Sequence, residues 1–143
     1  MTESWDQKFL AVAAHYATWS KDPTRSVGCV IVDENKIQLA GGFNGFPRGI
    51  ADDDRLKDKL IKQQIIVHAE VNAIAAAARK GHALEGGILY STLRPCPSCA
   101  TMIIQAGIKR VVTPAGIDER SKRDGCEFGE KLLLEAGVKV LKI

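Results

Sequence analysis

Residues 87–113, with the sequence GILYSTLRPCPSCATMIIQAGIKRVVT, decide the fold of this chain. The apolar, β-favouring run at 87–92 predicts one strand, and the β-branched run at 109–113 predicts a second. The segment between them predicts a helix to about 106–107, because Pro97 stands near its first position. Two strands joined by a helix lie parallel in one sheet, so this stretch predicts a β-α-β unit.

The N-terminal third predicts a helix followed by a hairpin. Ser4 and Gln7 form a capping-box pattern, and apolar residues at helical spacing continue the helix to 19–20. The apolar runs at 27–33 and 36–42 are separated by a short turn, so they predict two antiparallel strands.

The remaining segments continue the alternation of strands and helices. The alanine-rich residues 68–79 have one apolar face and predict a buried helix. Residues 50–67 predict an irregular, charged connector with a short helix within 56–66. Residues 126–136 predict a helix, and residues 138–143 predict the last strand.

The order of these elements places helices on both faces of a central sheet. We therefore predict the α/β class, with a three-layer α/β/α sandwich around a mixed five-stranded sheet. Strands 1 and 2 form a hairpin in this prediction, and strands 3–5 are parallel to one another. A chain of 143 residues without linkers or repeats predicts one domain over 1–143.

The composition argues against several classes of protein. Hydrophobic residues make up 45% of the chain and charged residues 26%, which is ordinary for a globular domain. No stretch approaches the roughly 20 apolar residues of a membrane span, and residues 1–6 lack the pattern of a secretory signal. We therefore expect a cytoplasmic protein without a membrane partner. The net charge of +3 is too mild to indicate the basic stripe of a duplex-binding protein.

The four cysteines, at positions 29, 96, 99 and 126, need an explanation other than export. Without a secretory signal, a disulfide framework is not expected. The Cys96-x-x-Cys99 pair is then a redox pair, a metal-binding pair or a chance pattern.

Three residues at two predicted helix starts have the chemistry of zinc ligands. His68 begins one helix, and Cys96 and Cys99 begin the other. One imidazole and two thiolates leave the fourth tetrahedral position open, which is the catalytic rather than the structural arrangement of zinc. The positive end of a helix dipole favours the thiolates that zinc needs. We expect one zinc ion per chain.

Glu70 lies two residues after His68 and supplies the second half of the chemistry. Zinc lowers the pKa of a water molecule to about 7, and a carboxylate beside it can accept the proton and return it to a substrate. Taken singly, the cysteine pair is also typical of redox proteins, and a glutamate at a helix start is commonly only a dipole partner. Together, H-x-E and P-C-x-x-C form the signature of zinc nucleobase deaminases.

Five segments extend this signature to most of the chain. They are SKDP at 20–23 with VG at 27–28, GFNGFPRG at 42–49, HAEVNAI at 68–74, TLRPCPSCA at 92–100 and IQAGIK at 104–109. In this order they resemble the deoxycytidylate (dCMP) deaminases of the cytidine deaminase superfamily. The resemblance implies a cytidine deaminase-like fold and zinc-dependent hydrolysis of dCMP to dUMP and ammonia, which supplies thymidylate synthesis.

The resemblance also assigns roles to residues of the site. His68, Cys96 and Cys99 would bind zinc, and Glu70 would shuttle protons. The sugar and base contacts would be made by Asn44, which would bind the deoxyribose, and by the segments at Ala69 and Thr92, which would read the amino group of the base.

The phosphate contacts depart from the family pattern. Relatives often carry a tyrosine in the loop after the fourth strand, where the nearest residue here is Ile117. We expect the phosphate to contact Arg25, Lys21 or Arg120 instead.

Assembly and regulation are further implications of the resemblance. Relatives form homo-oligomers, commonly hexamers, and respond to dCTP and dTTP. The loop with Gly45 and Arg48 is where such an effector would bind, and the acidic residues 52–54 would help to hold it through Mg²⁺.

Three alternatives stay open at this point. The substrate could be another cytosine nucleotide, such as dCTP or CMP, or a free nucleoside. A deaminase of tRNA or single-stranded DNA would need a positively charged groove and aromatic side chains that stack on bases. The chain has only eight aromatic residues and an acidic run at 52–54, and both features argue against this alternative. A zinc-stabilised module without activity would need a fourth protein ligand, and no second Cys or His motif offers one.

Overall fold

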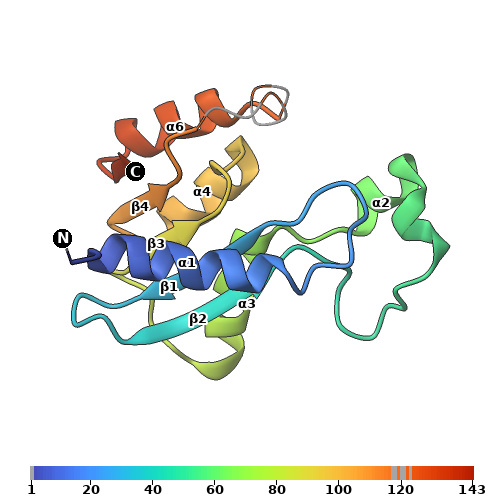
Figure 1. The fold of residues 1–143 in the computed structure, drawn as a ribbon, viewed down its shortest axis with the longest axis horizontal. Helices are drawn as coiled ribbons and strands as arrows, with labels where there is room; N and C mark the ends of the chain where they lie inside the picture. The colour runs from blue at the N-terminus through green and yellow to red at the C-terminus, as the bar shows by residue number, and fades with distance from the viewer. Residues whose placement is uncertain (1, 117–118, 120–121, 123) are drawn as a thin grey trace.

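A mixed five-stranded sheet forms the centre of the protein (Figure 1). The computed structural model describes every residue except 1, 117–118, 120–121 and 123. In space the strands follow the order β2-β1-β3-β4-β5. Their bounds are Gly28–Val32 for β1, Gln38–Phe43 for β2, Ile88–Ser91 for β3, Arg110–Thr113 for β4 and Lys139–Lys142 for β5.

The pairing of the strands confirms the predicted hairpin and the predicted parallel half. Strand β1 lies antiparallel to β2 on one side and to β3 on the other. Strands β3, β4 and β5 are parallel, as expected for strands joined by helices. The sheet therefore changes from antiparallel to parallel pairing at β3, beside the segment that carries the cysteine pair.

Helices cover both faces of the sheet, which confirms the three-layer prediction (Figure 1). Helix α1 (Trp5–Ala17) packs on one face against a small cluster that includes Val30, Val32 and Tyr90. The opposite face carries the larger core, to which helices α3 (Ala69–Lys80), α4 (Pro97–Gln105) and α6 (Cys126–Glu135) contribute. Alternate residues of β1 enter the two cores, because successive side chains of a strand point to opposite faces.

The first helix and the hairpin differ from the sequence prediction at their ends. Helix α1 ends at Ala17 rather than at 19–20, because Thr18 caps it through its hydroxyl and its backbone N–H. The turn of the hairpin is longer than expected. The carboxylate of Asp33 accepts hydrogen bonds from the backbone of Asn35 and Ile37, and Lys36 has a positive φ of 67°, so β2 begins only at Gln38.

The connector after β2 contains two short helices in place of one. A 3-10 helix, η1, spans Asp54–Lys57, and α2 spans Lys59–Ile65. Asp58 separates them, since its carboxylate caps α2 by accepting from the backbone of Leu60 and Ile61. Figure 1 shows this segment, in green, projecting beyond the ends of the strands.

Two glycines allow close contacts between helices and the backbone of neighbouring segments. A Cβ atom on Gly42 would lie 2.8 Å from the backbone nitrogen of Ala73 in α3. A Cβ atom on Gly129 would lie 2.4 Å from the carbonyl oxygen of Pro95. Helices α3 and α6 therefore sit closer to their neighbours than any side chain would allow. Within the described residues, none of the helices has the length and apolar character needed to cross a bilayer.

Candidate metal centre and active site

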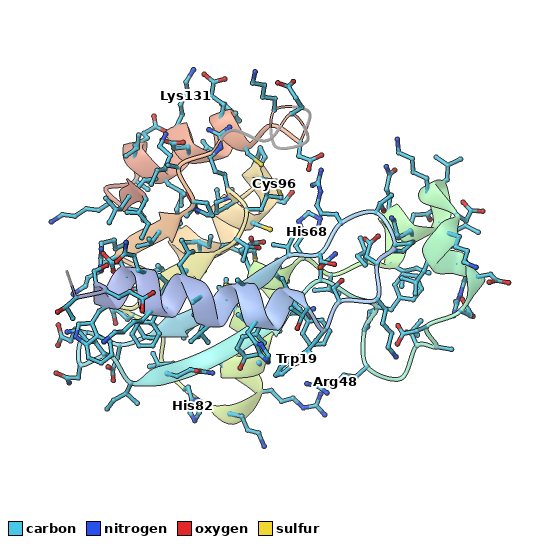
Figure 2. The ribbon with its side chains drawn as sticks, viewed as in Figure 1. Trp19, Arg48, His68, His82, Cys96 and Lys131 are labelled. Atoms are coloured by element: carbon cyan, nitrogen blue, oxygen red, sulfur yellow. The ribbon has the colours of Figure 1, made fainter. Side chains whose placement is uncertain are left out.

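The N-termini of α3 and α4 bring the three predicted zinc ligands together. His68 is the N-cap residue of α3 and Cys96 that of α4, and neither side chain caps its own helix. The side chains turn toward each other instead, as Figure 2 shows for His68 and Cys96. Nδ1 of His68 lies 3.3 Å from Sγ of Cys99 and 3.5 Å from Sγ of Cys96. All three ligand atoms lie within 4.8 Å of one another.

This geometry fits a zinc ion. With Zn–S bonds of about 2.3 Å and Zn–N bonds of about 2.0 Å, tetrahedral ligands place nitrogen and sulfur about 3.5 Å apart. The donor set of one imidazole and two thiols is one that zinc prefers over magnesium or calcium. Among the described residues, no other group of three or more histidine, cysteine or acidic side chains converges in this way.

The three ligands are coupled to one another by hydrogen bonds that shift their pKa values. A hydrogen bond from the Cys99 thiol and a second from His68 outweigh burial and lower the pKa of Cys96 to about 4. The bond to Cys96 in turn raises the pKa of His68, against the effect of burial. The pKa of Cys99 is raised by its bond to Cys96 and by burial. A coordinated divalent cation deprotonates such a thiol outright, so both sulfurs can serve as thiolate ligands.

Glu70 lies in the first turn of α3, and only 4% of it is exposed. Its Oε1 accepts a hydrogen bond of 2.6 Å from the hydroxyl of Ser91, the last residue of β3. Burying a carboxylate costs free energy unless hydrogen bonds or a functional partner compensate for the lost hydration. The sequence analysis missed Ser91, although a polar residue at the end of an otherwise apolar strand was a visible signal.

A cavity of about 650 Å³ opens in front of these groups. Volumes of about 300–1,000 Å³ are typical of small-molecule sites. The lining includes two of the three metal ligands, the carboxylate of Glu70 and apolar side chains: His68, Cys96, Glu70, Val27, Ala69 and Leu93. It also includes many charged side chains: Asp22, Arg25, Lys57, Lys59, Lys62 and Asp124.

The predicted sugar and base contacts take different positions. Asn44 lines the cavity, but its side chain also holds the loop before β1. Its Oδ1 accepts from the backbone of Val27 at 2.8 Å, and its Nδ2 donates to the carbonyl of Arg25 at 2.9 Å. Ala69 is fully buried and lines the cavity. The hydroxyl of Thr92 accepts from the backbone N–H of Gly28, so this side chain joins two strands.

The two predicted phosphate contacts that the structure describes, Arg25 and Lys21, lie in different places. Arg25 lines the cavity and forms an ion pair with Asp124. The side chain of Lys21 is 71% exposed, pairs with Asp52 at 3.1 Å and lines a separate, smaller depression. Arg120 and Ile117 lie outside the described residues.

An ion pair that the sequence did not reveal joins α2 to the cavity wall. Nζ of Lys62 lies 2.9 Å from Oδ1 of Asp22 and donates to the hydroxyl of Thr24. Burial opposes ionisation of Asp22, but the hydrogen bonds from Thr24 and Lys62 outweigh it and lower its pKa. The pattern of the charged connector could not show which of its lysines would reach the loop at 20–24.

The other two cysteines are placed as structural groups. Cys29 is fully buried in β1, where burial and the nearby Glu70 raise the pKa of its thiol. Cys126 lines the cavity at the start of α6, and burial raises its pKa to about 11. Its thiol therefore stays protonated near neutral pH, which is unlike a reactive cysteine.

The two predicted effector residues differ in their position relative to the metal centre: Gly45 pairs with Val67, which precedes His68, whereas Arg48 lies apart from it. The backbone of Gly45 pairs with Val67 in an isolated bridge, with hydrogen bonds of 3.1 and 2.8 Å. Arg48 is exposed on the following loop, and Figure 2 shows it well apart from His68 and Cys96.

Comparison with known proteins identifies relatives of the whole chain. The family model of the cytidine and deoxycytidylate deaminase zinc-binding region matches residues 3–115. A protein of Aliivibrio fischeri, described as an uncharacterized deaminase in the luxG 3′ region, is 38% identical, with 98% of this chain and 94% of the relative covered. Human deoxycytidylate deaminase is 42% identical over 115 residues, which are 76% of this chain and 63% of the human protein.

A solved structure shares the complete fold. The dCMP deaminase of the cyanophage S-TIM5, in complex with dCMP and dUMP, superposes with a TM-score of 0.80 at 26% identity, with 100% of this chain and 99% of the other covered. The chain spans about three fifths of the length of the animal deoxycytidylate deaminases that it matches.

Proposed function

Because the chain belongs to the cytidine and deoxycytidylate deaminase family, we propose that it catalyses the hydrolysis of dCMP to dUMP and ammonia with one zinc ion. One observation carries this proposal: a buried carboxylate, Glu70, lines a nucleotide-sized cavity together with two of three convergent zinc ligands. The similarity to a phage enzyme in complex with dCMP and dUMP supports the choice of substrate.

The reaction places two proton transfers on Glu70. The oxygen of water adds to C4 of the cytosine ring while Glu70 accepts a proton and passes it to N3. The second proton of the water goes through Glu70 to the amino group, which leaves as ammonia, and C4 becomes a carbonyl carbon. The hydrogen bond from Ser91 keeps the carboxylate oriented during both transfers.

His68, Cys96 and Cys99 would hold the zinc ion. When bound, zinc lowers the pKa of a water molecule toward neutrality and stabilises negative charge on the attacking oxygen. The chain itself supplies the remaining selectivity. Val27, Ala69 and Leu93, which line the cavity, would exclude bulk water around the base, and the backbone near Ala69 and Leu93 would read its amino group.

Arg25 would contact the phosphate, because it lines the cavity, whereas Lys21 lines a separate depression and pairs with Asp52. Asn44 would contact the deoxyribose while it holds the Arg25 loop. Initial rates for dCMP, CMP, dCTP and deoxycytidine compared on the same preparation test this assignment. Equal kcat/KM for dCMP and deoxycytidine would contradict a phosphate contact at Arg25.

The Glu70→Gln variant tests the proton transfers directly. The substitution keeps size and removes the charge, so we expect zinc content near one per chain and ammonia release from dCMP reduced by a factor of about 10³ or more. Metal analysis and ammonia release on one preparation give both values. Undiminished turnover with Gln at this position would exclude Glu70 as the proton carrier.

A pair of cysteine variants tests the metal site. Cys96→Ser should lose zinc and activity, whereas Cys126→Ser, in the same cavity but outside the ligand cluster, should keep about one zinc per chain. Chelation of the wild type should abolish ammonia release, and added Zn²⁺ should restore it. Full activity after complete chelation would refute the zinc mechanism.

We further propose a cytoplasmic homo-oligomer, a hexamer by family resemblance, that responds to dCTP and dTTP with Mg²⁺. The described cysteines are all free of disulfides, which fits a reducing compartment. Trp5, Leu60 and Phe128 are large apolar side chains more than half exposed, which fits subunit contacts. Sedimentation measures the number of subunits in the oligomer. Rates of dCMP deamination with added dCTP or dTTP, compared between wild type and Arg48→Ala, test the effector loop. A monomer, or rates insensitive to both nucleotides, would contradict this part.

A further inference from the structure

Arg25 and Asp124, which both line the cavity, form an ion pair. The two residues lie 99 positions apart, Arg25 in the loop before β1 and Asp124 in the turn before α6. Both line the cavity that contains His68, Cys96 and Glu70. Their side chains are 27% and 39% exposed, so the pair is open to solvent and to an entering solute.

The backbone under Arg25 is fixed while its side chain is not buried. Asn44 holds the carbonyl of Arg25 and the N–H of Val27, and Asn44 itself is 5% exposed. Lys62 holds Asp22 on the other side of the same loop. A change of partner at Arg25 therefore requires rotation of its side chain and no movement of the loop.

Two other cationic groups of the cavity, Lys62 and Arg94, are held more tightly than Arg25, whereas the side chain of Lys57 is 78% exposed. The side chain of Lys62 is 13% exposed and is engaged by both Asp22 and Thr24. That of Arg94 is 11% exposed and pairs with Glu130 of α6 at 3.4 Å. Arg25 is the more exposed of these three cations, and its described carboxylate partner also belongs to the cavity lining.

We propose that Asp124 occupies, in the free enzyme, the anion position on Arg25 that the 5′-phosphate of the substrate takes on binding. This inference rests on the proposed deamination of dCMP. A guanidinium presents the same fork of donors to a carboxylate and to a phosphate, so one can replace the other on Arg25. The phosphate carries close to two negative charges at neutral pH and competes well against one carboxylate.

The exchange makes Asp124 a specificity-determining residue. A nucleotide supplies an anion that takes over Arg25, whereas an uncharged nucleoside leaves the ion pair in place and gains nothing from it. Because the pair is solvent-exposed and screened, it is weak enough for a substrate to open. Asp124 then opposes phosphate binding by competition, and its removal should help nucleotides alone.

A double-mutant cycle on Arg25 and Asp124 tests the exchange. In Asp124→Asn we expect the KM for dCMP to fall by about threefold, since the competitor is gone. In Arg25→Gln we expect it to rise by about tenfold, and kcat/KM for deoxycytidine should change by less than about twofold in both variants. In the double variant the gain from Asp124→Asn should disappear, because its effect acts through Arg25.

The control is Glu34→Gln, which removes one negative charge from the exposed Glu34–Lys109 pair away from the cavity. This variant should leave the KM for dCMP and the kcat/KM for deoxycytidine unchanged. A KM for dCMP in Asp124→Asn that is unchanged or higher would overturn the exchange. So would a gain that persists without Arg25, since simple repulsion between Asp124 and the phosphate would then explain it. Equal effects on dCMP and deoxycytidine would show a purely structural ion pair.

Binding of dUMP by calorimetry separates this inference from the proposed function. Tighter dUMP binding in Asp124→Asn supports the exchange even if no deamination of dCMP is detected, in which case only the proposed reaction fails. Deamination of dCMP with dUMP affinities that do not differ between wild type and Asp124→Asn leaves the function intact and refutes the exchange.

Discussion

The hydroxyl of Ser91 donates a hydrogen bond of 2.6 Å that positions the carboxylate of Glu70. The side chain of Ser91 is fully buried at the end of β3, so losing its hydrogen bond leaves the buried carboxylate of Glu70 without this donor, at a cost in free energy. At the scale of single residues, this hydrogen bond decides how well Glu70 serves the reaction, while the zinc ligands decide whether a reaction occurs.

Ser91→Ala should therefore lower kcat more than it changes KM. A hydrogen bond to a charged group contributes about 1.5–3 kcal/mol, so we expect kcat for dCMP to fall by about 10- to 100-fold. Steady-state rates with zinc content measured in parallel check this. Ser98→Ala, an exposed serine between the two cysteine ligands, is the matched control. An effect of equal size at Ser98 would show that the loss is not specific to the Glu70 contact.

At the scale of elements, helix α6 supports the turn that carries Cys96. Gly129 lets the helix lie against Pro95 and Cys96, whose backbone atoms would be 2.4 and 3.0 Å from an added Cβ atom. Since these neighbours are backbone atoms, they can yield only by moving the turn itself. The packing of α6 therefore helps to determine the position of the metal ligand Cys96.

Gly129→Ala should weaken both stability and zinc binding. Overpacking a close contact costs about 1–3 kcal/mol, and the displaced turn should raise the dissociation constant for zinc. Urea unfolding and competition with a chelator measure the two effects. Gly116→Ala is the control, because a Cβ atom there meets nothing within 4 Å. If Gly129→Ala binds zinc as tightly as the wild type, the packing of α6 does not position the metal site.

At the scale of the whole molecule, Asp6 ties the first helix to the parallel half of the sheet. Its carboxylate accepts two hydrogen bonds from Arg110, at 3.0 and 2.9 Å, and one from the hydroxyl of Tyr90 at 2.8 Å. These contacts join α1 to β3 and β4 across up to 104 residues of sequence. The hydrogen bond from Arg110 is the main cause of the lowered pKa of Asp6, and burial opposes it.

This network predicts a specific dependence of stability on pH. A carboxyl group whose pKa is lower in the folded than in the unfolded chain stabilises the fold above its unfolded pKa of about 3.9 and loses that contribution as the pH falls through its folded pKa. Asp6→Asn should lower the free energy of unfolding by about 1 kcal/mol at pH 7. The difference from wild type should shrink below about pH 4. A difference that stays constant down to pH 2 in chemical unfolding would contradict the assignment.

The sequence by itself determined the elements, their order and the metal ligands. Apolar periodicity identified the sheet and its covering helices, and the local motifs at His68, Glu70 and Cys96 identified the zinc chemistry. These features depend on residues close in the chain, so they can be read from spacing. Element ends were wrong where side chains capped or extended a turn, as at Thr18 and Asp33.

Only the tertiary structure decided which distant side chains meet around the cavity. Ser91 with Glu70, Lys62 with Asp22 and Arg25 with Asp124 are pairs separated by 21, 40 and 99 residues. No periodicity encodes such contacts, because they follow from the order of strands in the sheet and from the path of an irregular connector. The physical reason is that hydrogen bonds and ion pairs act over a few ångströms in space, whatever the distance along the chain.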